Sequence, residues 1–330
     1  MDTPTLDTPA NKVAGNPVES PVKGLHHVTA IASNPQANLD FYSRTLGLRF
    51  VKKTVNFDDP GTYHLYYGDA VGHPGTVMTF FPWMDLPRGG GGTGEVGVTQ
   101  FAVPEGSLDF WRHRIDQSPG RVLAEGVGFG ERHVLAEDPD GLTFSMAERP
   151  TDARTPWMAA DVGAEAAVRG FNGVTLTLAD RTATGELLTG LMGYEEVGTQ
   201  GNLTRYRSLN TEDAGIVDII EDPQGRHARQ GAGRVHHVAF NVDDRAAQLV
   251  LRNRLIESGF QVTPVIDRNY FFAIYFRTPG GVLFEVATNE PGFTADEAED
   301  MLGQSLKLPA QHEPLRQRIE EVLPPLTLSS

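Results

Sequence analysis

The chain has 330 residues, of which 39% are hydrophobic, and it carries a formal net charge of −15 and no cysteine. The length allows two ordinary domains with real cores, and the missing cysteines exclude disulfides, thiolate metal sites and cysteine nucleophiles. The acidic charge argues against general binding to nucleic acid or to an anionic membrane surface, so we expect a small-molecule substrate.

The chain opens with a segment that lacks hydrophobic periodicity. Residues 1–21 are rich in Pro, Thr, Asp and Asn, which predicts a disordered tail. This start has no basic region followed by an apolar one, and no later run reaches the roughly 20 apolar residues that span a bilayer. We therefore expect no membrane segment and a cytoplasmic location.

A repeated unit follows the tail. The segment from Gly24, GLHHVTAIASNPQANLDFYSRTLGLRFV, and the one from Gly170, GFNGVTLTLADRTATGELLTGLMGYEEV, both read as strand, polar turn, amphipathic helix, glycine and strand. The segments from Gly94 and Gly233 have the same plan, and further strands separated by turn residues close each unit. The chain therefore contains four copies of a β-α-β-β-β module, near residues 22–88, 94–150, 168–222 and 232–292.

Four such modules predict an α+β fold. One module cannot cover the open face of its own sheet, so the modules should pair into two curved, barrel-like sheets around clefts. Changes in composition mark a polar linker and a helical C-terminal end. The predicted organisation is a tail (1–21), an N-terminal domain with modules one and two (22–152), a linker (153–167), a C-terminal domain with modules three and four (168–300) and a C-terminal helical extension (301–330).

Two histidine pairs and one glutamate stand out among apolar strand residues. The pairs are His26-His27 in module one and His236-His237 in module four, and Glu285 follows in the last strand of module four. Side chains alternate along a strand, so only one histidine of each pair should face a shared cavity unless a bulge intervenes. Glu285 lies in the run VLFEV, where an ionised carboxylate is costly without a positive partner.

Aligning the modules gives two candidate ligand positions in each. If modules one and four face each other, His27, His237 and Glu285 converge although 210 positions separate the histidines. Two imidazoles and a carboxylate leave open positions on an ion, as in non-heme Fe(II) oxygenases, and zinc accepts the same donors. The alternative is a purely structural role without a metal, with core histidines whose hydrogen bonds are satisfied and a glutamate paired with an arginine. In module order, the aligned positions are His27, Val98, Gly173 and His237 in the first strand, and Thr79, Ser145, an unplaced residue within 217–220 and Glu285 in the last strand.

Several motifs together resemble one enzyme family. They are GLHHVTAI, YHLYYGD with GHPGTVMTFFPW, GRVHHVAFNV, DRNYFFAIYFRTPGGVLFEVAT and LPAQHEPLRQRIEEVLPPL. From about Gly24 to Leu326 the chain resembles the ring-cleaving dioxygenases of the vicinal oxygen chelate superfamily, in particular the branch that opens hydroquinones. The resemblance implies an Fe(II) ion, with Mn(II) or Zn(II) as alternatives, held by His27, His237 and Glu285.

The resemblance also implies a substrate pocket and a reaction. Its catalytic residues would be His26, His236, Arg268 and Tyr275. The implied enzyme is an Fe(II)-dependent dioxygenase that inserts both atoms of O2 into a hydroquinone-type dihydric phenol. Its partners would be a small aromatic substrate and O2, and a homo-oligomer is compatible with the fold.

Three rival functions share this fold. A glyoxalase I-type isomerase generally takes a fourth protein ligand near the position of Thr79, where this chain offers no His, Glu or Gln. A catechol extradiol dioxygenase usually draws all three ligands from its C-terminal domain, which the place of His27 disfavours. A metal-free binding protein would not need Glu285. The remaining strand histidines of module one, His64 and His73, have no counterparts in module four, so we expect structural or turn roles for them.

Overall fold

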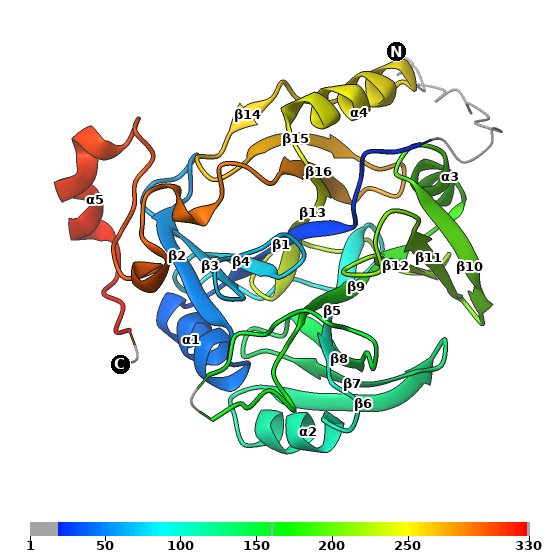
Figure 1. Cartoon of the computed structure of the whole chain (residues 1–330), viewed down its shortest axis with the longest axis horizontal. Helices are drawn as coiled ribbons and strands as arrows, with labels where there is room; N and C mark the ends of the chain where they lie inside the picture. Colours follow the sequence, from blue (N-terminus) through cyan, green and yellow to red (C-terminus); the bar gives the residue numbers. More distant parts are fainter. Residues whose placement is uncertain (1–18, 160, 329–330) are drawn as a thin grey trace, which may run out of the picture.

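The computed structural model describes residues 19–159 and 161–328, and two curved sheets of eight strands form its frame (Figure 1). The first sheet combines modules one and four. From edge to edge its strands are β14 (Ile266–Asp267), β15 (Phe272–Arg277), β16 (Leu283–Thr288), β13 (Arg234–Val242), β1 (Leu25–Ala32), β4 (Val77–Pro82), β3 (Tyr63–Gly68) and β2 (Arg49–Val55).

The second sheet combines modules two and three in the same order. Its strands are β10 (Tyr194–Gln200), β11 (Leu203–Ser208), β12 (Ile216–Glu221), β9 (Gly170–Leu178), β5 (Glu95–Val103), β8 (Thr143–Glu148), β7 (Glu131–Glu137) and β6 (Arg121–Gly128). The predicted α+β fold with four β-α-β-β-β modules in two curved sheets is therefore confirmed. Each sheet takes one module from each predicted domain, and the domain boundaries themselves stay a prediction. The predicted tail lies almost wholly outside the described residues.

Helices follow the first strand of each module. The one in module one begins with Asn34, whose side chain accepts a hydrogen bond from the backbone N–H of Ala37, and continues as a π-helical turn. Gly47 ends it with a φ of 69°, a conformation that favours glycine. The helices are α1 (Pro35–Asp40), the π-helix η1 (Phe41–Thr45), α2 (Leu108–Asp116), α3 (Thr182–Gly190), α4 (Arg245–Glu257), α5 (Arg316–Val322) and the 3-10 turns η2 (Phe293–Ala295), η3 (Glu299–Met301) and η4 (Glu313–Leu315).

The modules meet through their first strands. In the first sheet β1 pairs antiparallel with β13, and in the second sheet β5 pairs antiparallel with β9. The register of each pair skips one residue on each strand, so each strand carries a β-bulge. The skipped residues are His26 and His236 in the first sheet, and Gly97 and Asn172 in the second.

A main hydrophobic core joins the two sheets, and a smaller cluster draws its strand residues from the first sheet alone. The smaller cluster includes Tyr66, Tyr270, Phe271 and Phe293. Beyond β16, the chain returns to the edge strand β2, where Leu306 forms a β-bridge with Lys53. Figure 1 shows α5 beside this edge of the first sheet.

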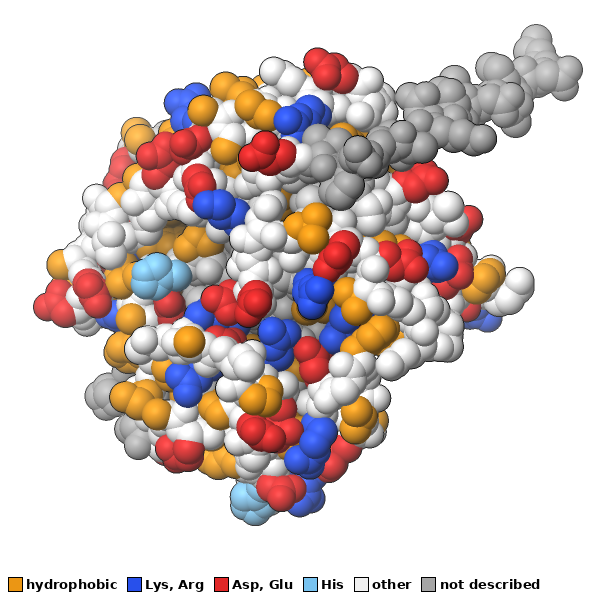
Figure 2. All heavy atoms as spheres, turned by 45° about the vertical axis from the view of Figure 1, so that its right-hand side comes forward, with side chains coloured by type: hydrophobic (Ala, Val, Ile, Leu, Met, Phe, Trp, Pro, Cys, Tyr) orange, Lys and Arg blue, Asp and Glu red, His pale blue; other side chains and the backbone are white. Residues whose placement is uncertain are grey.

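The outer surface mixes both charges. Figure 2 shows acidic and basic side chains interspersed over one face, with apolar side chains between them. Among the described helices, none is long and apolar enough to cross a membrane.

Candidate metal centre and substrate pocket

The strand register brings the proposed ligands into one neighbourhood. His27 pairs with Ala239 across β1 and β13, and Ala239 pairs with Glu285 across β13 and β16. His237 precedes Ala239 by two residues, so it shares the same face of the sheet. The small side chain of Ala239 leaves space between its larger neighbours, and the three predicted ligands converge over it.

The three side chains are close enough to share one ion. Ligand atoms of His27, His237 and Glu285 all lie within 4.8 Å of one another, and all three residues are buried. The Nε2 atoms of His27 and His237 lie 3.3 Å and 2.9 Å from the same Glu285 oxygen, Oε2. A single small cation placed among these atoms would contact all three donors.

The first histidine of each pair holds the second. The Nδ1 atoms of His26 and His27 are 2.9 Å apart, and those of His236 and His237 are 2.8 Å apart. The bulges at His26 and His236 let adjacent side chains meet in this way, with ring planes at 83° and 80°. When the second histidine carries its proton on Nδ1 and donates it to the first, its Nε2 presents a lone pair, as a metal ligand must.

Burial lowers the pKa of three of these imidazoles, those of His26, His236 and His237. It lowers the pKa of His26 to about 3, with His27 adding to the shift, and it lowers the pKa of His236 to about 4, with His237 adding to it. The pKa of His237 is also lowered, again chiefly by burial. Burial alone would raise the pKa of Glu285, but positive charge on His27 and hydrogen bonds from His237 and His27, when these imidazoles are protonated towards the carboxylate, outweigh burial and hold that pKa well below its usual value.

The donor set fits a divalent metal ion. Both carboxylate oxygens of Glu285 are buried without a hydrogen-bond partner, although two imidazole nitrogens approach one of them closely. When both ligand imidazoles carry their protons on Nδ1, the ionised carboxylate faces two lone pairs in a dry site, which is unfavourable unless a cation lies between them. Nitrogen and oxygen donors of this kind suit iron, manganese and zinc.

A cavity of about 330 Å³ opens beside the three ligands. His27, His237, Glu285 and the predicted residues His236, Arg268 and Tyr275 line it, whereas His26 lies behind His27 and outside the lining. The rest of the wall is largely aromatic, which suits a single planar ring. The aromatic wall residues are Phe57, Tyr66, Phe81, Trp83 and Phe271.

Arg268 and Tyr275 form one hydrogen-bonded unit in the pocket. The Nε–H of Arg268 donates to the Tyr275 hydroxyl oxygen at 3.2 Å, which leaves the hydroxyl proton available to another acceptor. Burial, with the nearby charge of Glu285, raises the pKa of Tyr275 well above its usual value, so the hydroxyl stays protonated. The unit therefore offers a fixed positive charge and a neutral donor.

His64 lines the pocket, a position that the alignment of module one with module four did not predict. Its Nε2 lies 2.8 Å from the hydroxyl of Thr79, and Tyr66 lies 2.8 Å from its Nδ1. Thr79 donates in turn to Thr29 at 2.9 Å, so His64 must donate from Nε2 and accept at Nδ1. Side-chain alternation along β3 could have indicated this position of His64. His64 and Tyr66 share a face of the strand, and Tyr66 pairs with Thr79. The other doubtful histidine, His73, does lie in a turn, where its Nδ1 is 2.6 Å from Asp69.

The position of a fourth protein ligand is thus occupied by Thr79, whose hydroxyl is engaged by its neighbours. In module three the corresponding residue is Asp218, which pairs with Thr175 just as Thr79 pairs with Thr29. This places the residue that the sequence alignment left open.

The second sheet carries an ion-pair network where the first carries the ligand set. Asp218 accepts two hydrogen bonds of 2.9 Å from Arg205, and Arg205 also donates to Glu131 at 2.6 Å. Arg205 and Glu131 border a cleft of about 930 Å³. Asp218 and Glu131 already have an arginine partner, and the described residues hold no second group of metal-ligand side chains like that of the first sheet.

Comparisons with known proteins agree with this geometry. The model of the Glyoxalase/Bleomycin resistance protein/Dioxygenase superfamily matches residues 24–146 and 178–286. A Bacillus subtilis protein named as ring-cleaving dioxygenase MhqO is 45% identical over 302 residues, covering 92% of this chain and 96% of its own. The chlorohydroquinone/hydroquinone 1,2-dioxygenase of Sphingobium indicum is 34% identical, covering 90% of this chain and 95% of its own.

A solved structure extends the similarity to three dimensions. A crystal structure named as a dioxygenase from Bacillus subtilis superposes with a TM-score of 0.90 at 44% identity, covering 94% of this chain and 99% of that chain. The family model matches both halves of the chain, and the relatives at 45% and 34% identity cover about nine-tenths of it. The chain therefore belongs to the Glyoxalase/Bleomycin resistance protein/Dioxygenase superfamily, among its ring-cleaving dioxygenases.

Proposed function

We propose that this enzyme uses Fe(II), held by His27, His237 and Glu285, to open the ring of a hydroquinone-type dihydric phenol with both atoms of O2. The observation that carries the proposal is the three-ligand set on one wall of an aromatic pocket, with Thr79 at the fourth-ligand position. Three protein donors leave open positions for substrate and oxygen. The relative that acts on hydroquinone supports the substrate class.

The protein side of the reaction follows from the pocket residues. When bound, ferrous iron supplies the redox chemistry that lets an electron-rich ring react with O2. Arg268 neutralises negative charge on the ionised phenol, and Tyr275 donates a hydrogen bond to an oxygen atom as charge develops on it. His236 lines the pocket as a neutral imidazole whose Nδ1 accepts from His237, so its Nε2–H can donate a hydrogen bond to a substrate oxygen.

His26 has a different role in this proposal. It lies outside the pocket lining and 3% exposed, so it acts by holding Nδ1 of His27 rather than by touching substrate. Partners of this kind fix the ring orientation and tautomer of a ligand histidine. The flat aromatic wall excludes water and holds a single ring.

The test is oxygen uptake after anaerobic loading with Fe(II). We expect uptake with hydroquinone or methylhydroquinone, one O2 for each ring opened, and less with catechol. His27→Gln should abolish uptake, and His73→Gln, which changes a turn histidine of the same module, should retain it. No uptake with any phenol, together with metal-dependent isomerisation of a hemithioacetal, would replace this proposal by an isomerase.

A further inference from the structure

The turn between β14 and β15 presents two residues to the pocket and one to the opposite side. Arg268 and Phe271 line the pocket, whereas Tyr270 is buried in the smaller hydrophobic cluster behind it. The backbone N–H of Arg268 donates to Phe271, and that of Tyr270 donates to Arg268. Asn269 has a φ of 68°, so the turn is tight. Because these backbone hydrogen bonds hold the turn together, a contact that restrains Tyr270 also restrains the backbone of Arg268.

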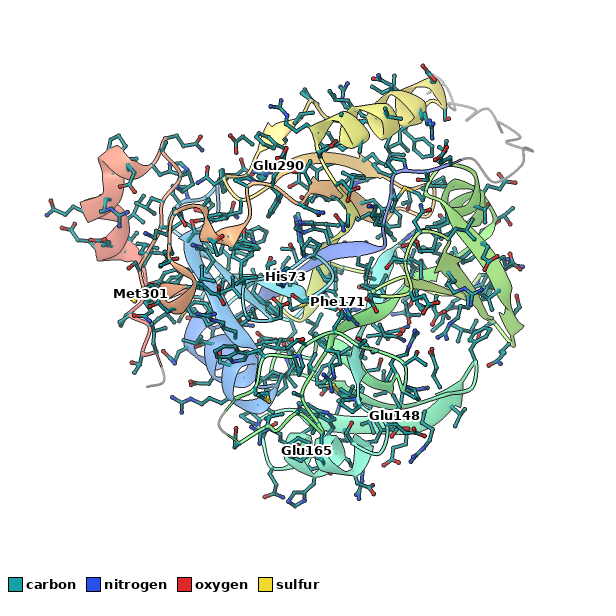
Figure 3. All side chains as sticks on the ribbon, viewed as in Figure 1. His73, Glu148, Glu165, Phe171, Glu290 and Met301 are labelled. Carbon is teal, nitrogen blue, oxygen red and sulfur yellow. The ribbon has the colours of Figure 1, made fainter. Side chains whose placement is uncertain are left out.

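The chain beyond β16 holds Tyr270 from behind. This C-terminal segment, residues 290–306, includes Glu290 and Met301, both labelled in Figure 3. The Tyr270 hydroxyl donates to Oδ2 of Asp296 at 2.9 Å, and the Tyr270 backbone carbonyl accepts from Gly292. Phe293 lies with its ring centroid 5.1 Å from that of Tyr270 and at the same distance from that of Tyr66, another pocket residue.

A buried lysine joins this segment to module one. Lys52 on β2 has no exposed surface, and its Nζ lies 2.7 Å from Oδ1 of Asp296 and 2.6 Å from Oε2 of Glu297. The same Nζ is 4.9 Å from the centre of the Tyr270 ring, within the range of a cation–π contact. Asp296 thus bridges Lys52 and Tyr270 through its two oxygens, and the two carboxylates compensate the buried ammonium.

We propose that Lys52, Asp296 and Glu297 form a clamp that positions the 268–271 turn, and that Lys52 is a positioning residue for Arg268. The inference rests on the proposed substrate-binding role of Arg268. Buried ion pairs are weak contributors to stability because desolvation offsets their attraction, so a fully buried lysine between two carboxylates needs another explanation. Fixing one conformation of a turn that faces the substrate is such an explanation, since small displacements of a positioning group strongly slow a reaction.

Three variants test the clamp in the full-length, metal-loaded enzyme. Lys52→Met removes the charge at similar length. Tyr270→Phe removes only the hydrogen bond to Asp296 and keeps the ring packing and both ion pairs, so it covers the case in which Lys52→Met fails to fold. Lys53→Met is the matched control, because it removes the adjacent lysine of β2, which feels the charge of Glu297 but is not the lysine that forms the ion pairs with Asp296 and Glu297.

We expect Lys52→Met to lower kcat/KM for hydroquinone by about 10- to 100-fold, the scale of an ångström-sized misplacement. Tyr270→Phe should lower it less, and Lys53→Met should leave it unchanged. Co(II) affinity should stay at the wild-type value in all three, because the ligands are untouched. Lys52→Met should also weaken the anaerobic binding of hydroquinone to the Zn(II)-loaded protein.

A double-mutant cycle separates positioning from general destabilisation. If Lys52 acts through Arg268, Lys52→Met should cause no further loss of kcat/KM or hydroquinone binding in an Arg268→Ala background. Equal losses in both backgrounds, or wild-type values for both Lys52→Met and Tyr270→Phe, would overturn the clamp. A protein that binds hydroquinone anaerobically but consumes no O2 would instead overturn the proposed function, and the binding cycle would still decide the clamp.

Discussion

Replacing Glu285 by Gln distinguishes a metal ligand from one half of a buried ion pair. The substitution keeps the shape of the side chain and removes its charge. If His237 were a cation paired with Glu285, the change would leave that cation buried and alone, at a cost of about 3–5 kcal/mol in the free energy of unfolding. If the imidazoles are neutral with their protons on Nδ1, the change relieves a carboxylate that faces two lone pairs. The metal-free variant should then unfold at the same free energy as the wild type, or a higher one.

The metal-bound state should respond in the opposite direction. An ion present at 100 times its Kd stabilises the folded protein by about 2.7 kcal/mol. If loss of the carboxylate raises Kd at least 100-fold, the same concentration adds only about 0.4 kcal/mol. The variant should therefore lose about 2 kcal/mol of the stabilisation that the metal gives the wild type, while the free energy of unfolding of the metal-free protein does not fall.

The assay is urea denaturation with and without Zn(II), which cannot undergo redox chemistry. Glu148→Gln is the matched control, because Glu148 is a buried glutamate on β8, the strand of module two that corresponds to β16. Its metal-induced stabilisation should equal that of the wild type. A metal-free Glu285→Gln protein that loses 3 kcal/mol or more, together with an unchanged response to Zn(II), would refute the assignment of Glu285 as a ligand.

Three further predictions concern the surroundings of the ligands. His26→Gln and His236→Gln should each weaken Co(II) binding about 10- to 100-fold, because each removes the partner of a ligand Nδ1, and unchanged titrations would contradict this. Thr79→Glu places a carboxylate at the fourth-ligand position, so Zn(II) affinity should rise. Oxygen uptake of the Fe(II) enzyme should fall at least about tenfold, which corresponds to about 1.4 kcal/mol in the activation free energy. Wild-type uptake would count against the argument that the metal needs an open position. The folded-state pKa of His26, about 3, lies below its value in the unfolded chain, so its contribution is present above pH 6.5 and is lost as pH falls towards 3. Urea midpoints of the metal-free protein should reflect a slope of about 1.4 kcal/mol per pH unit from His26 alone, and His26→Gln should flatten the profile.

The sequence was sufficient for the modules, the fold class and the convergence of the ligand types. Strand periodicity and repetition give these directly, because aligned modules share one register and one inward face. The bulges were harder to predict. They depend on how two first strands pair across 210 positions, and alternation alone places His26 and His27 on opposite faces.

The pocket wall shows the second limit. The imidazole of His64 gains its place from Thr79 on a neighbouring strand and from Tyr66 two residues on, and no single-module comparison reveals such a cross-strand group. In the proposed clamp the turn of Arg268 likewise depends on Lys52, from module one, and on Asp296, from the segment beyond β16. Contacts between distant segments decide the surroundings of the site, whereas local pattern decides its donors.

The bulges recur in the second sheet at Gly97 and Asn172, where the aligned ligand positions hold Val98 and Gly173. Metal coordination therefore does not maintain the bulge, which comes with the pairing of two first strands. The half of the molecule without a ligand set is thus an internal control for the half that has one. It also shows what a second centre would require, because a Cβ at Gly173 would clash with the backbone of Ile216, so an imidazole there needs β12 to shift, whereas Val98 already carries a side chain.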